Sequence, residues 1–553
     1  MRHDADAIVI GSGAGGLTAA LALARAGKRV VVFEQHYLPG GWCHSFSLEG
    51  HQFSPGVHYI GELGPGGYMR AIYEGLGVAN DLLFHELNPD GYDHIVIGAG
   101  RDEARFDIPK GKARFAERLC ARFPRERAGI HAFLDNSERI AKELMSGVSA
   151  RGWKEKATLP WRLRTTLRYG WMSLARFLDG FVKDPMLKAI LGMQAGDHGL
   201  PPSRVPTAMH ATILAHYFDG GWYPRGGAKA LPKAFIKQLR AHGGQLHLST
   251  SVARVLTEGA GDSLRTVGVR LGDGTEVRAP VVISNADPHV TLGRLVGREL
   301  LSPSTQKKLD RVKYSVSALS LFLAAELDAR GAGLDSGNLW YGRTPDLEAI
   351  YRLAEQRTLS GDLQLPGVFL TTTTLKDPTK QKGRLHTMES FAFVSYEPFA
   401  KWAKTTYGER PEDYARMKDA LTERMLDTID EFVPGLRERV VFKALGTPLT
   451  NVHYCAATRG NLYGTEKTLR NLPPLGFSIK TDVSGLWMCG ASTLGHGVAG
   501  ATISGLAVAK AVLRCRRDEL LGARGHVLRT MPAEAVTHGT ASDEPEDEVV
   551  GSA

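Results

Sequence analysis

Residues 7–16 read Ala-Ile-Val-Ile-Gly-Ser-Gly-Ala-Gly-Gly, a short apolar run that passes directly into a glycine-rich turn. An Ala- and Leu-rich helical pattern follows and stops at Gly27, a residue suited to the left-handed position after a helix. A second apolar run, residues 30–33, then ends at the acidic residue Glu34. This order of strand, glycine turn, helix and strand predicts a βαβ unit at the start of an α/β chain.

The glycine turn matches the GxGxxG pattern of dinucleotide-binding sites through Gly11, Gly13 and Gly16. These glycines provide a tight turn, let backbone N–H groups approach a pyrophosphate, and allow close packing of helix on strand. The helix directs its positive end at the phosphates, and Glu34 is placed to bind the ribose hydroxyls. A carboxylate there repels a ribose phosphate, which argues against NADP and leaves FAD or NAD. The predicted contacts in this segment are Gly11, Gly13, Ala14, Gly15, Gly16, Glu34 and Gln35.

Two further glycine segments favour FAD. Gly40-Gly41 follows Glu34 closely and resembles the extension found in two-domain FAD enzymes of the amine oxidase and phytoene desaturase superfamily. Near the end of the chain, a strand-like run leads to Gly490, and a helical pattern opens at Gly497 and Val498. In that superfamily the equivalent helix end lies at the N1/O2 edge of the flavin, where its N–H groups stabilise the anionic reduced ring. The resemblance implies that Gly40, Gly41, Gly490, Gly497 and Val498 contact FAD.

Five segments carry a more specific signature: residues 30–36 (VVVFEQH), 40–46 (GGWCHSF), 55–61 (PGVHYIG), 222–227 (WYPRGG) and 284–287 (SNAD). Together they resemble the retinol saturases, which are relatives of plant carotenoid isomerases and bacterial phytoene desaturases. The resemblance implies one FAD, a redox or isomerisation reaction at a conjugated double bond, and an apolar tunnel that ends at the flavin. It also implies that Val252 contacts the adenine side through its backbone. Outside the C-terminal flavin segment, the sequence has no second GxGxxG for a dedicated nicotinamide domain, so NAD(P)H as an electron donor would dock transiently in the shared cleft.

The predicted fold is an α/β, two-domain FAD-binding fold of the amine oxidase and phytoene desaturase type, with a Rossmann-like FAD domain and an interleaved substrate-binding domain. We assign residues 1–110, 215–300 and 480–515 to the FAD domain. Residues 111–214, which are helical in pattern, and residues 301–479, which mix helices and strands, form the substrate domain. Residues 516–553 contain four basic and eight acidic residues without apolar periodicity and predict a disordered acidic tail.

Saturating a carbon–carbon double bond needs a hydride, which flavin N5 supplies, and a proton from a neighbouring acid. His58 and Tyr59 follow the second glycine pair on a strand that runs towards the flavin ring in the resembled enzymes. Either side chain could donate the proton or anchor a substrate hydroxyl, although a packed core histidine and tyrosine give the same signal. His58 and Tyr59 are therefore the predicted catalytic residues.

Residues 153–181 combine three tryptophans with several arginines. Leu167 and Trp171 lie at helical spacing on one side, whereas Arg164 and Arg168 lie together on another. This amphipathic, basic pattern is typical of a helix in a lipid interface, and a core-facing helix produces the same periodicity. Peripheral membrane contact through this segment would give an insoluble substrate a route into the protein.

Bulk composition narrows the remaining classes. A chain with 43% hydrophobic and 23% charged residues is globular in type, and it has no uninterrupted run of about 18 apolar residues for a membrane span. The sequence passes from Met1 directly into the first strand pattern, which predicts a cytoplasmic protein. Five scattered cysteines without CxxC spacing predict reduced thiols and no metal site. The net charge of +9 comes without a nucleic-acid-binding motif, so nucleic acid is not an expected partner.

The leading hypothesis is an FAD-dependent oxidoreductase that acts on carbon–carbon double bonds of a retinoid, carotenoid or other apolar isoprenoid, and that is most like the retinol saturases. A phytoene-type desaturase or a carotenoid cis–trans isomerase stays open, because the resemblance does not fix the direction of reaction. An FAD amine oxidase is an alternative of another class, although its aromatic cage is not identified. A flavin-free, lipid-binding escort protein is a further alternative, and the intact glycine motifs argue against it.

Overall fold

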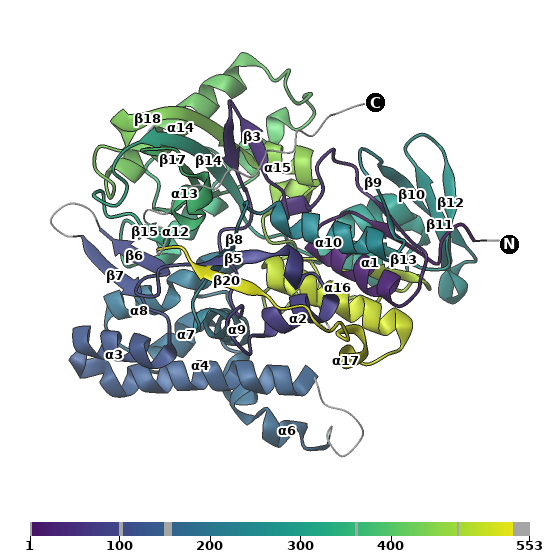
Figure 1. Ribbon diagram of the computed structural model, residues 1–553, viewed down its shortest axis with the longest axis horizontal. Coiled ribbons are helices and arrows are strands. Elements are labelled where there is room, and N and C mark those ends of the chain that lie inside the picture. Colours follow the sequence, from purple (N-terminus) through teal and green to yellow (C-terminus); the bar gives the residue numbers. More distant parts are fainter. Residues whose placement is uncertain (1–2, 99–102, 149–156, 360–362, 473–474, 535–553) are drawn as a thin grey trace.

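The computed structural model describes residues 3–98, 103–148, 157–359, 363–472 and 475–534. In these ranges the strands form two large sheets, with helices packed against both (Figure 1). The helices are α1 (Ala14–Arg25), α2 (Tyr68–Leu76), α3 (Lys112–Arg122), α4 (Arg127–Val148), α6 (Leu159–Arg162), α7 (Leu174–Asp179), α8 (Pro185–Gly192), α9 (Thr207–Tyr217), α10 (Ala230–Ala241), α11 (Pro303–Arg311), α12 (Leu347–Arg352), α13 (Thr373–Lys376), α14 (Glu412–Asp430), α15 (Pro448–Cys455), α16 (Gly497–Leu513) and α17 (Arg517–Leu520).

The first large sheet is parallel throughout. Its order is β19 (Leu486–Met488), β13 (Val282–Ser284), β1 (Ala7–Ile10), β2 (Val30–Phe33) and β9 (Gln245–His247). Helices α1, α10 and α16 cover one face, and an antiparallel sheet of β10 (Val252–Glu258), β11 (Arg265–Leu271) and β12 (Glu276–Arg278) packs on the other. Because both faces are buried, β1 and β2 are apolar at every position instead of alternating.

The second large sheet is mixed. Its order is β18 (Val440–Gly446), β14 (Ser317–Glu326), β17 (Leu385–Val394), β16 (Gly367–Thr372), β15 (Asn338–Gly342), β6 (Asp93–Ile97) and β7 (Ala104–Ile108). Alternate residues point to opposite faces, so Leu339 and Tyr341 pack towards α14, whereas Trp340 packs towards the layer of α3, α4, α7, α8 and α9. The sheet therefore has a hydrophobic core on each face.

A three-stranded sheet lies between the two large sheets (Figure 1). In it, β5 (Leu83–Glu86) pairs with β8 (Trp222–Pro224) on one side and with β20 (Arg529–Pro532) on the other. A separate hairpin is formed by β3 (Phe46–Leu48) and β4 (His51–Phe53).

Two segments differ from the sequence-based boundaries. Strands β6 and β7, inside the range 1–110, belong to the mixed sheet, because β6 pairs in parallel with β15 and β7 pairs with β6. The predicted tail from residue 516 contains α17 and β20, which are held by pairing with β5 and by burial of Leu520 and Leu528. The acidic run at residues 543–548 lies outside the described residues.

The basic segment at residues 157–181 is broken instead of forming one helix. After α6, Glu143 accepts backbone N–H groups from Thr165 and Thr166, at 3.2 and 2.7 Å, and a π-helical turn follows at Thr166–Gly170. The side chain of Ser173 then caps α7. No helix in the described ranges is long and apolar enough to cross a bilayer.

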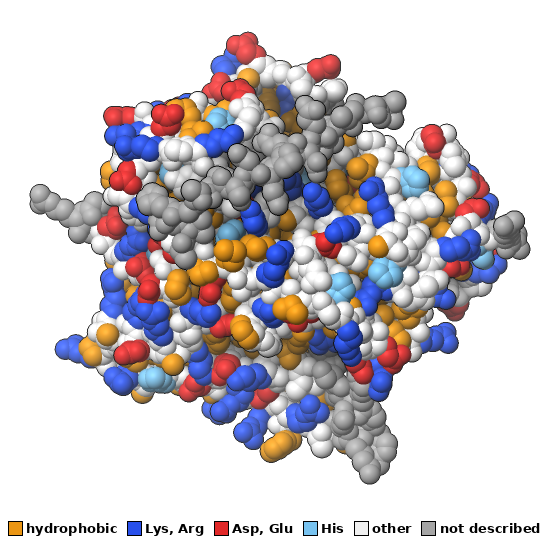
Figure 2. All heavy atoms as spheres, viewed as in Figure 1, with side chains coloured by type: hydrophobic (Ala, Val, Ile, Leu, Met, Phe, Trp, Pro, Cys, Tyr) orange, Lys and Arg blue, Asp and Glu red, His pale blue; other side chains and the backbone are white. Residues whose placement is uncertain are grey.

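The break divides the apolar side chains of this segment into two groups. Leu174 and Leu178 are buried, whereas Trp161, Leu167 and Trp171 are 72%, 51% and 56% exposed. Basic and hydrophobic side chains gather at the lower edge of the molecule, where α6 lies (Figure 2).

Candidate cofactor and substrate site

The carboxyl ends of four parallel strands meet at one edge of the first sheet. Gly11 follows β1, Glu34 follows β2, Asn285 follows β13 and Gly490 lies just after β19. This edge is where open α/β sheets bind their ligands. The sequence-predicted glycine loop, acidic residue and C-terminal glycine are therefore brought together by the parallel register.

Close backbone contacts explain the glycines of this loop. A Cβ at Gly16 would collide with the carbonyl oxygen of Gly11, and a Cβ at Gly41 would lie 3.3 Å from the Cα of Gly13. A Cβ at Gly13 would collide with the Asn285 amide, which lies across the loop. Gly13 is also the N-cap of α1 and provides no side-chain cap, so the first N–H groups of the helix stay available to an anion.

Glu34 links the two glycine segments through Ser12. Its carboxylate accepts the Ser12 backbone N–H at 2.8 Å, the Ser12 hydroxyl at 2.7 Å and the His36 N–H at 2.9 Å. The Ser12 hydroxyl oxygen in turn accepts the N–H of Gly40 at 3.0 Å. A carboxylate has about four acceptor positions, so one remains for a ribose hydroxyl.

The other predicted contacts border the same edge less closely. Val252 begins β10, two residues after Thr250, whose N–H donates to the Glu34 carbonyl oxygen at 2.8 Å. Gln35 is exposed. Gly497 and Val498 open α16, whose N-cap residue His496 provides no side-chain hydrogen bond to the helix end.

These groups fit a dinucleotide such as FAD. The glycine loop leaves no room for side chains where a pyrophosphate approaches, and the uncapped end of α1 presents N–H donors to it. Glu34 retains acceptor capacity for a ribose, and the uncapped end of α16 offers a second set of donors.

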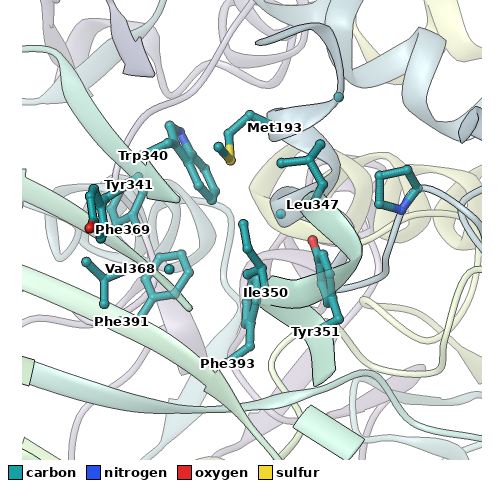
Figure 3. A pocket seen from close by; sticks show the side chains of 14 residues that line it. Met193, Trp340, Tyr341, Leu347, Ile350, Tyr351, Val368, Phe369, Phe391 and Phe393 are labelled. Atoms are coloured by element: carbon teal, nitrogen blue, oxygen red, sulfur yellow. The ribbon is translucent and has the colours of Figure 1, made fainter. Parts of the chain in front are cut away.

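An apolar cavity lies in the second domain, between the mixed sheet and the helical layer (Figure 3). The empty space is ≈ 380 Å³ when the part open to solvent is counted. Its walls come from β15, β16, β17, α12 and the end of α8. The side chains that line it include Met193, Trp340, Tyr351, Phe369, Phe391 and Phe393. The cavity suits a flat, conjugated, apolar ligand.

His58 packs against two aromatic residues that line this cavity. Its ring packs against Phe369 and Phe391, with centroid distances of 4.9 and 5.9 Å. Its Nδ1 lies 3.4 Å from Oε2 of the buried Glu389, and neither atom has a hydrogen-bond partner among the described residues. The ammonium of Lys376 donates to the His58 carbonyl oxygen at 2.5 Å, which fixes the backbone there.

Tyr59 points away from His58 into a buried polar cluster. Its hydroxyl lies 3.1 Å from Oδ2 of Asp93 and 3.3 Å from Oδ2 of Asp197, and its ring stacks on Tyr217. Burial and the two carboxyl groups hold the pKa of Tyr59 well above its usual range. Tyr59 is therefore neutral and tied to two carboxyl groups.

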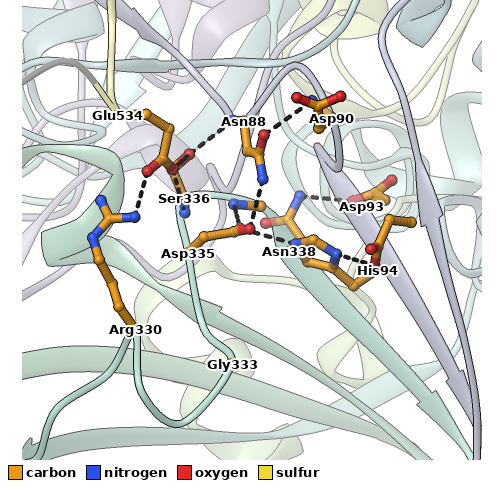
Figure 4. A network of polar contacts seen from close by, with 12 residues as sticks. Asn88, Asp90, Asp93, His94, Arg330, Gly333, Asp335, Ser336, Asn338 and Glu534 are labelled. Atoms are coloured by element: carbon orange, nitrogen blue, oxygen red, sulfur yellow. Dashed lines mark hydrogen bonds and ion pairs between the residues drawn. The ribbon is translucent and has the colours of Figure 1, made fainter.

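Asp93 is held by amide donors from β15 and from the turn after α8. Asn338 donates to its Oδ1 at 2.9 Å, and Gln194 donates to its Oδ2 at 3.0 Å. The Asn338 amide oxygen accepts from Lys376, and burial lowers the pKa of Lys376 to about 7. Figure 4 shows the Asn338–Asp93 hydrogen bond beside a second network around Asp335.

A histidine pair joins the helical layer to the start of α16. The Nδ1 of His198 and the Nε2 of His496 lie 2.9 Å apart, and the ring of His496 packs near Tyr463 at 5.3 Å. Burial lowers the pKa of His496 to about 3, so the pair is neutral. This contact brings the turn Met193–His198 from the cavity wall to the start of α16.

Sequence reasoning did not identify several polar residues of this region. Asp93 and Glu389 are acidic residues in largely apolar segments, which is the one signal that could have marked them, whereas Asp197 and Lys376 lie in mixed segments. Their roles depend on strand pairing across long stretches of chain, and no local motif reports that pairing.

Comparisons with known proteins agree in family and fold. A family model described as flavin containing amine oxidoreductase matches residues 14–513. All-trans-retinol 13,14-reductase of Danio rerio is 30% identical over 535 residues, which cover 92% of this chain and 86% of that protein. Chloroplastic prolycopene isomerase of Daucus carota is 25% identical and covers 92% of this chain and 80% of its own. A crystal structure of an oxidoreductase from Methanosarcina mazei matches with a TM-score of 0.61 at 19% identity, covering 91% of this chain and 99% of that chain.

Proposed function

The chain belongs to the flavin-containing amine oxidoreductase family, and from this membership we propose that it is an FAD-dependent reductase of a carbon–carbon double bond. Its substrate is an apolar polyene, and a retinoid is the leading class, as the name of the Danio rerio relative suggests. The observation that carries this proposal is the aromatic cavity. His58 packs against Phe369 of the cavity wall, and the wall turn Met193–His198 reaches the start of α16.

The FAD-binding set combines the glycine loop with the later glycine segments. Glu34 binds the ribose, the N-terminus of α1 binds the pyrophosphate, and the start of α16 binds the flavin ring. When bound, the flavin supplies the hydride for one carbon of the double bond. The set consists of Gly11, Gly13, Ala14, Gly15, Gly16, Glu34, Gln35, Gly40, Gly41, Val252, Gly490, Gly497 and Val498.

The cavity binds the polyene by stacking and excludes water from it. Its aromatic walls, which include Trp340 and Phe369, match the flat conjugated chain. His58 anchors a polar end of the substrate, because its ring lies on this aromatic wall and its Nδ1 faces Glu389. Tyr59 takes part in proton transfer, because its hydroxyl is bonded to carboxyl groups.

Electrons reach the flavin from NAD(P)H, which docks transiently in the cleft between the domains. We place the enzyme in the cytoplasm, in peripheral contact with a membrane through residues 153–181, of which 153–156 lie outside the described residues. Exposed Trp161 and Trp171, with Arg164 and Arg168 beside them, support this contact. The lipid surface would deliver an insoluble substrate.

Cis–trans isomerisation is the second candidate, and the similarity to a prolycopene isomerase favours it. The same cavity and flavin would serve that reaction, but the polyene would keep all its double bonds. The flavin would stay reduced at the end of each turnover.

The test uses purified holoenzyme with its flavin reduced under anaerobic conditions. All-trans-retinol should reoxidise the flavin and yield a product with one double bond fewer. A changed polyene geometry with the flavin still reduced would establish the isomerase instead. Reduction of the oxidised flavin by a simple amine, without any response to polyenes, would refute both. Glu34→Ala should lose FAD during purification, since it removes the ribose partner.

A further inference from the structure

Asp197 occupies the point where the cavity wall meets the flavin loop. The preceding residue, Gly196, lines the cavity against Trp340, and the following residue, His198, bonds to His496 at the start of α16. The side chain of Asp197 is half-buried. Its charge acts on Tyr351, which lines the cavity, and on Tyr463, which packs near His496, so its carboxyl group lies near both proposed sites.

The number of hydrogen atoms available around the Tyr59 hydroxyl favours one protonated carboxyl group beside it. A tyrosine hydroxyl has a single hydrogen, and two carboxyl oxygens, from Asp93 and Asp197, lie within 3.3 Å of it. If both groups were ionised, one carboxylate oxygen would face the lone pairs of the Tyr59 oxygen without a hydrogen between them. The arrangement therefore favours one protonated carboxyl group that donates to Tyr59.

The distribution of donors decides which group is protonated. Asp93 accepts from Asn338 and Gln194 in addition to Tyr59, and these bonds stabilise its ionised form. Asp197 has Tyr59 alone as a side-chain partner among the described residues. Asp93 is therefore the carboxylate, and Asp197 is the neutral acid that donates to Tyr59.

The pKa of Asp197 agrees with its assignment as the protonated carboxyl group. Burial, and then repulsion from Asp93, raise the pKa of Asp197 to about 8. Burial also raises the pKa of Asp93, while the bonds from Asn338, Gln194 and Tyr59 oppose that rise. The titratable groups that face this cluster from the surrounding elements are Tyr59, Tyr92, Asp93, His198, Tyr217, Tyr351, Lys376 and Tyr463.

We propose that Asp197 is the catalytic acid that delivers the proton to the substrate double bond, with Tyr59 and Asp93 holding it protonated between turnovers and a proton from solvent water restoring it after each one. This assignment rests on the proposed reductase function. In the step, the O–H bond of Asp197 breaks and a C–H bond forms at one alkene carbon. The hydride supplied by the flavin forms the second C–H bond, so the alkene gains two electrons and the flavin loses two. Asp197 is left as a carboxylate beside Asp93, and this like-charge repulsion favours its reprotonation.

The kinetic test is stopped-flow reoxidation of the dithionite-reduced holoenzyme by all-trans-retinol. Asp197→Asn keeps the size of the side chain but removes the acid, and it should slow reoxidation by about 10²-fold or more. The flavin spectrum and the quenching of protein fluorescence by retinol should stay unchanged. Asp179→Asn, an exposed residue paired with Lys188 on the same helical layer, is the matched control and should react like the wild type.

Two further readouts separate an acid from a structural residue. The wild-type rate should fall above about pH 8, and this alkaline limb should be absent from the residual rate of Asp197→Asn. The infrared difference spectrum between wild type and Asp197→Asn at pH 7 should contain the C=O band of a protonated carboxyl group. That band needs no substrate.

The outcomes distinguish this proposal from the proposed function. Wild-type reoxidation rates in Asp197→Asn, or an infrared spectrum without the protonated carboxyl band, would overturn the role of Asp197 and leave the reductase standing. If retinol and carotenoid polyenes fail to reoxidise the wild type, the reductase function falls, and the role of Asp197 as its acid falls with it.

Discussion

Asp197→Asn should stabilise the protein at neutral pH while it removes the proposed acid. The pKa of Asp197 is about 8 in the folded chain, compared with 3.8 for an ordinary aspartate. At pH 7 the unfolded chain has released this proton, so folding must take it up again. One pKa unit corresponds to about 1.4 kcal/mol, and a gap of about three units between pH 7 and the unfolded pKa gives an upper bound of ~4 kcal/mol. Asparagine avoids this cost, and its amide can donate to Tyr59 as the protonated acid does.

The sign of the pH dependence follows from the raised pKa. The folded state binds one more proton than the unfolded state between about pH 4 and pH 8, so the wild type loses stability as the pH rises through this window. Asparagine does not titrate. The advantage of the variant should therefore be greatest near pH 8, smaller at pH 5 and absent below pH 4.

The assay is the thermal unfolding midpoint of the wild-type and Asp197→Asn holoenzymes, measured at intervals from pH 5 to pH 8. Asp179→Asn controls for the loss of a carboxylate at an exposed position, and its difference from the wild type should be small at every pH. A variant that is less stable than the wild type at pH 7, or a difference that does not change with pH, would refute the conclusion that Asp197 is a buried neutral acid.

Four other variants address the cofactor, the membrane, the substrate and proton transfer. Gly13→Val should abolish FAD retention, because its Cβ would collide with the amide that lies across the glycine loop; a purified variant with a full flavin spectrum would contradict the site. Replacing Arg164 and Arg168 together by glutamate should weaken binding to anionic liposomes by about 1 kcal/mol per basic residue, measured by liposome sedimentation. Unchanged sedimentation would remove this segment as the membrane contact. His58→Ala should raise the KM for retinol about tenfold with little change in kcat, the loss of one hydrogen bond of about 1.4 kcal/mol. Tyr59→Phe should lower kcat at constant KM, and the reverse pattern in steady-state kinetics would exchange the two roles.

The fold of the parallel-sheet half of the molecule could be predicted from the sequence, because its motifs consist of residues close together in the chain. The GxGxxG loop and Glu34 lie on one βαβ unit, and their function follows from backbone geometry within that unit. The family resemblance extended this reading to Gly40-Gly41 and Gly490, and parallel strand pairing places Gly490 at the same sheet edge.

The domain limits were less accessible to sequence reasoning. β6 follows the glycine segments without a break in composition, yet it pairs with β15. Asp93 of β6 and Asn338 of β15, which are hydrogen-bonded, are 245 positions apart in the chain. Similarly, β20 follows a polar stretch and is ordered by pairing with β5 near the start of the chain. Single-sequence patterns report the type of an element, and they do not report its partner.

The α/β FAD-type fold, and the glycine loops and Glu34 that we propose as its cofactor contacts, were predictable from residues close together in the chain. Which polar side chains meet around Tyr59 depends on tertiary structure. Tyr59 reaches Asp93 and Asp197 across 34 and 138 positions, through a strand register and a turn that no local pattern encodes. The chemistry of these groups is also tertiary in origin, because an aspartate becomes a neutral acid only when burial and a second carboxylate oppose its ionisation.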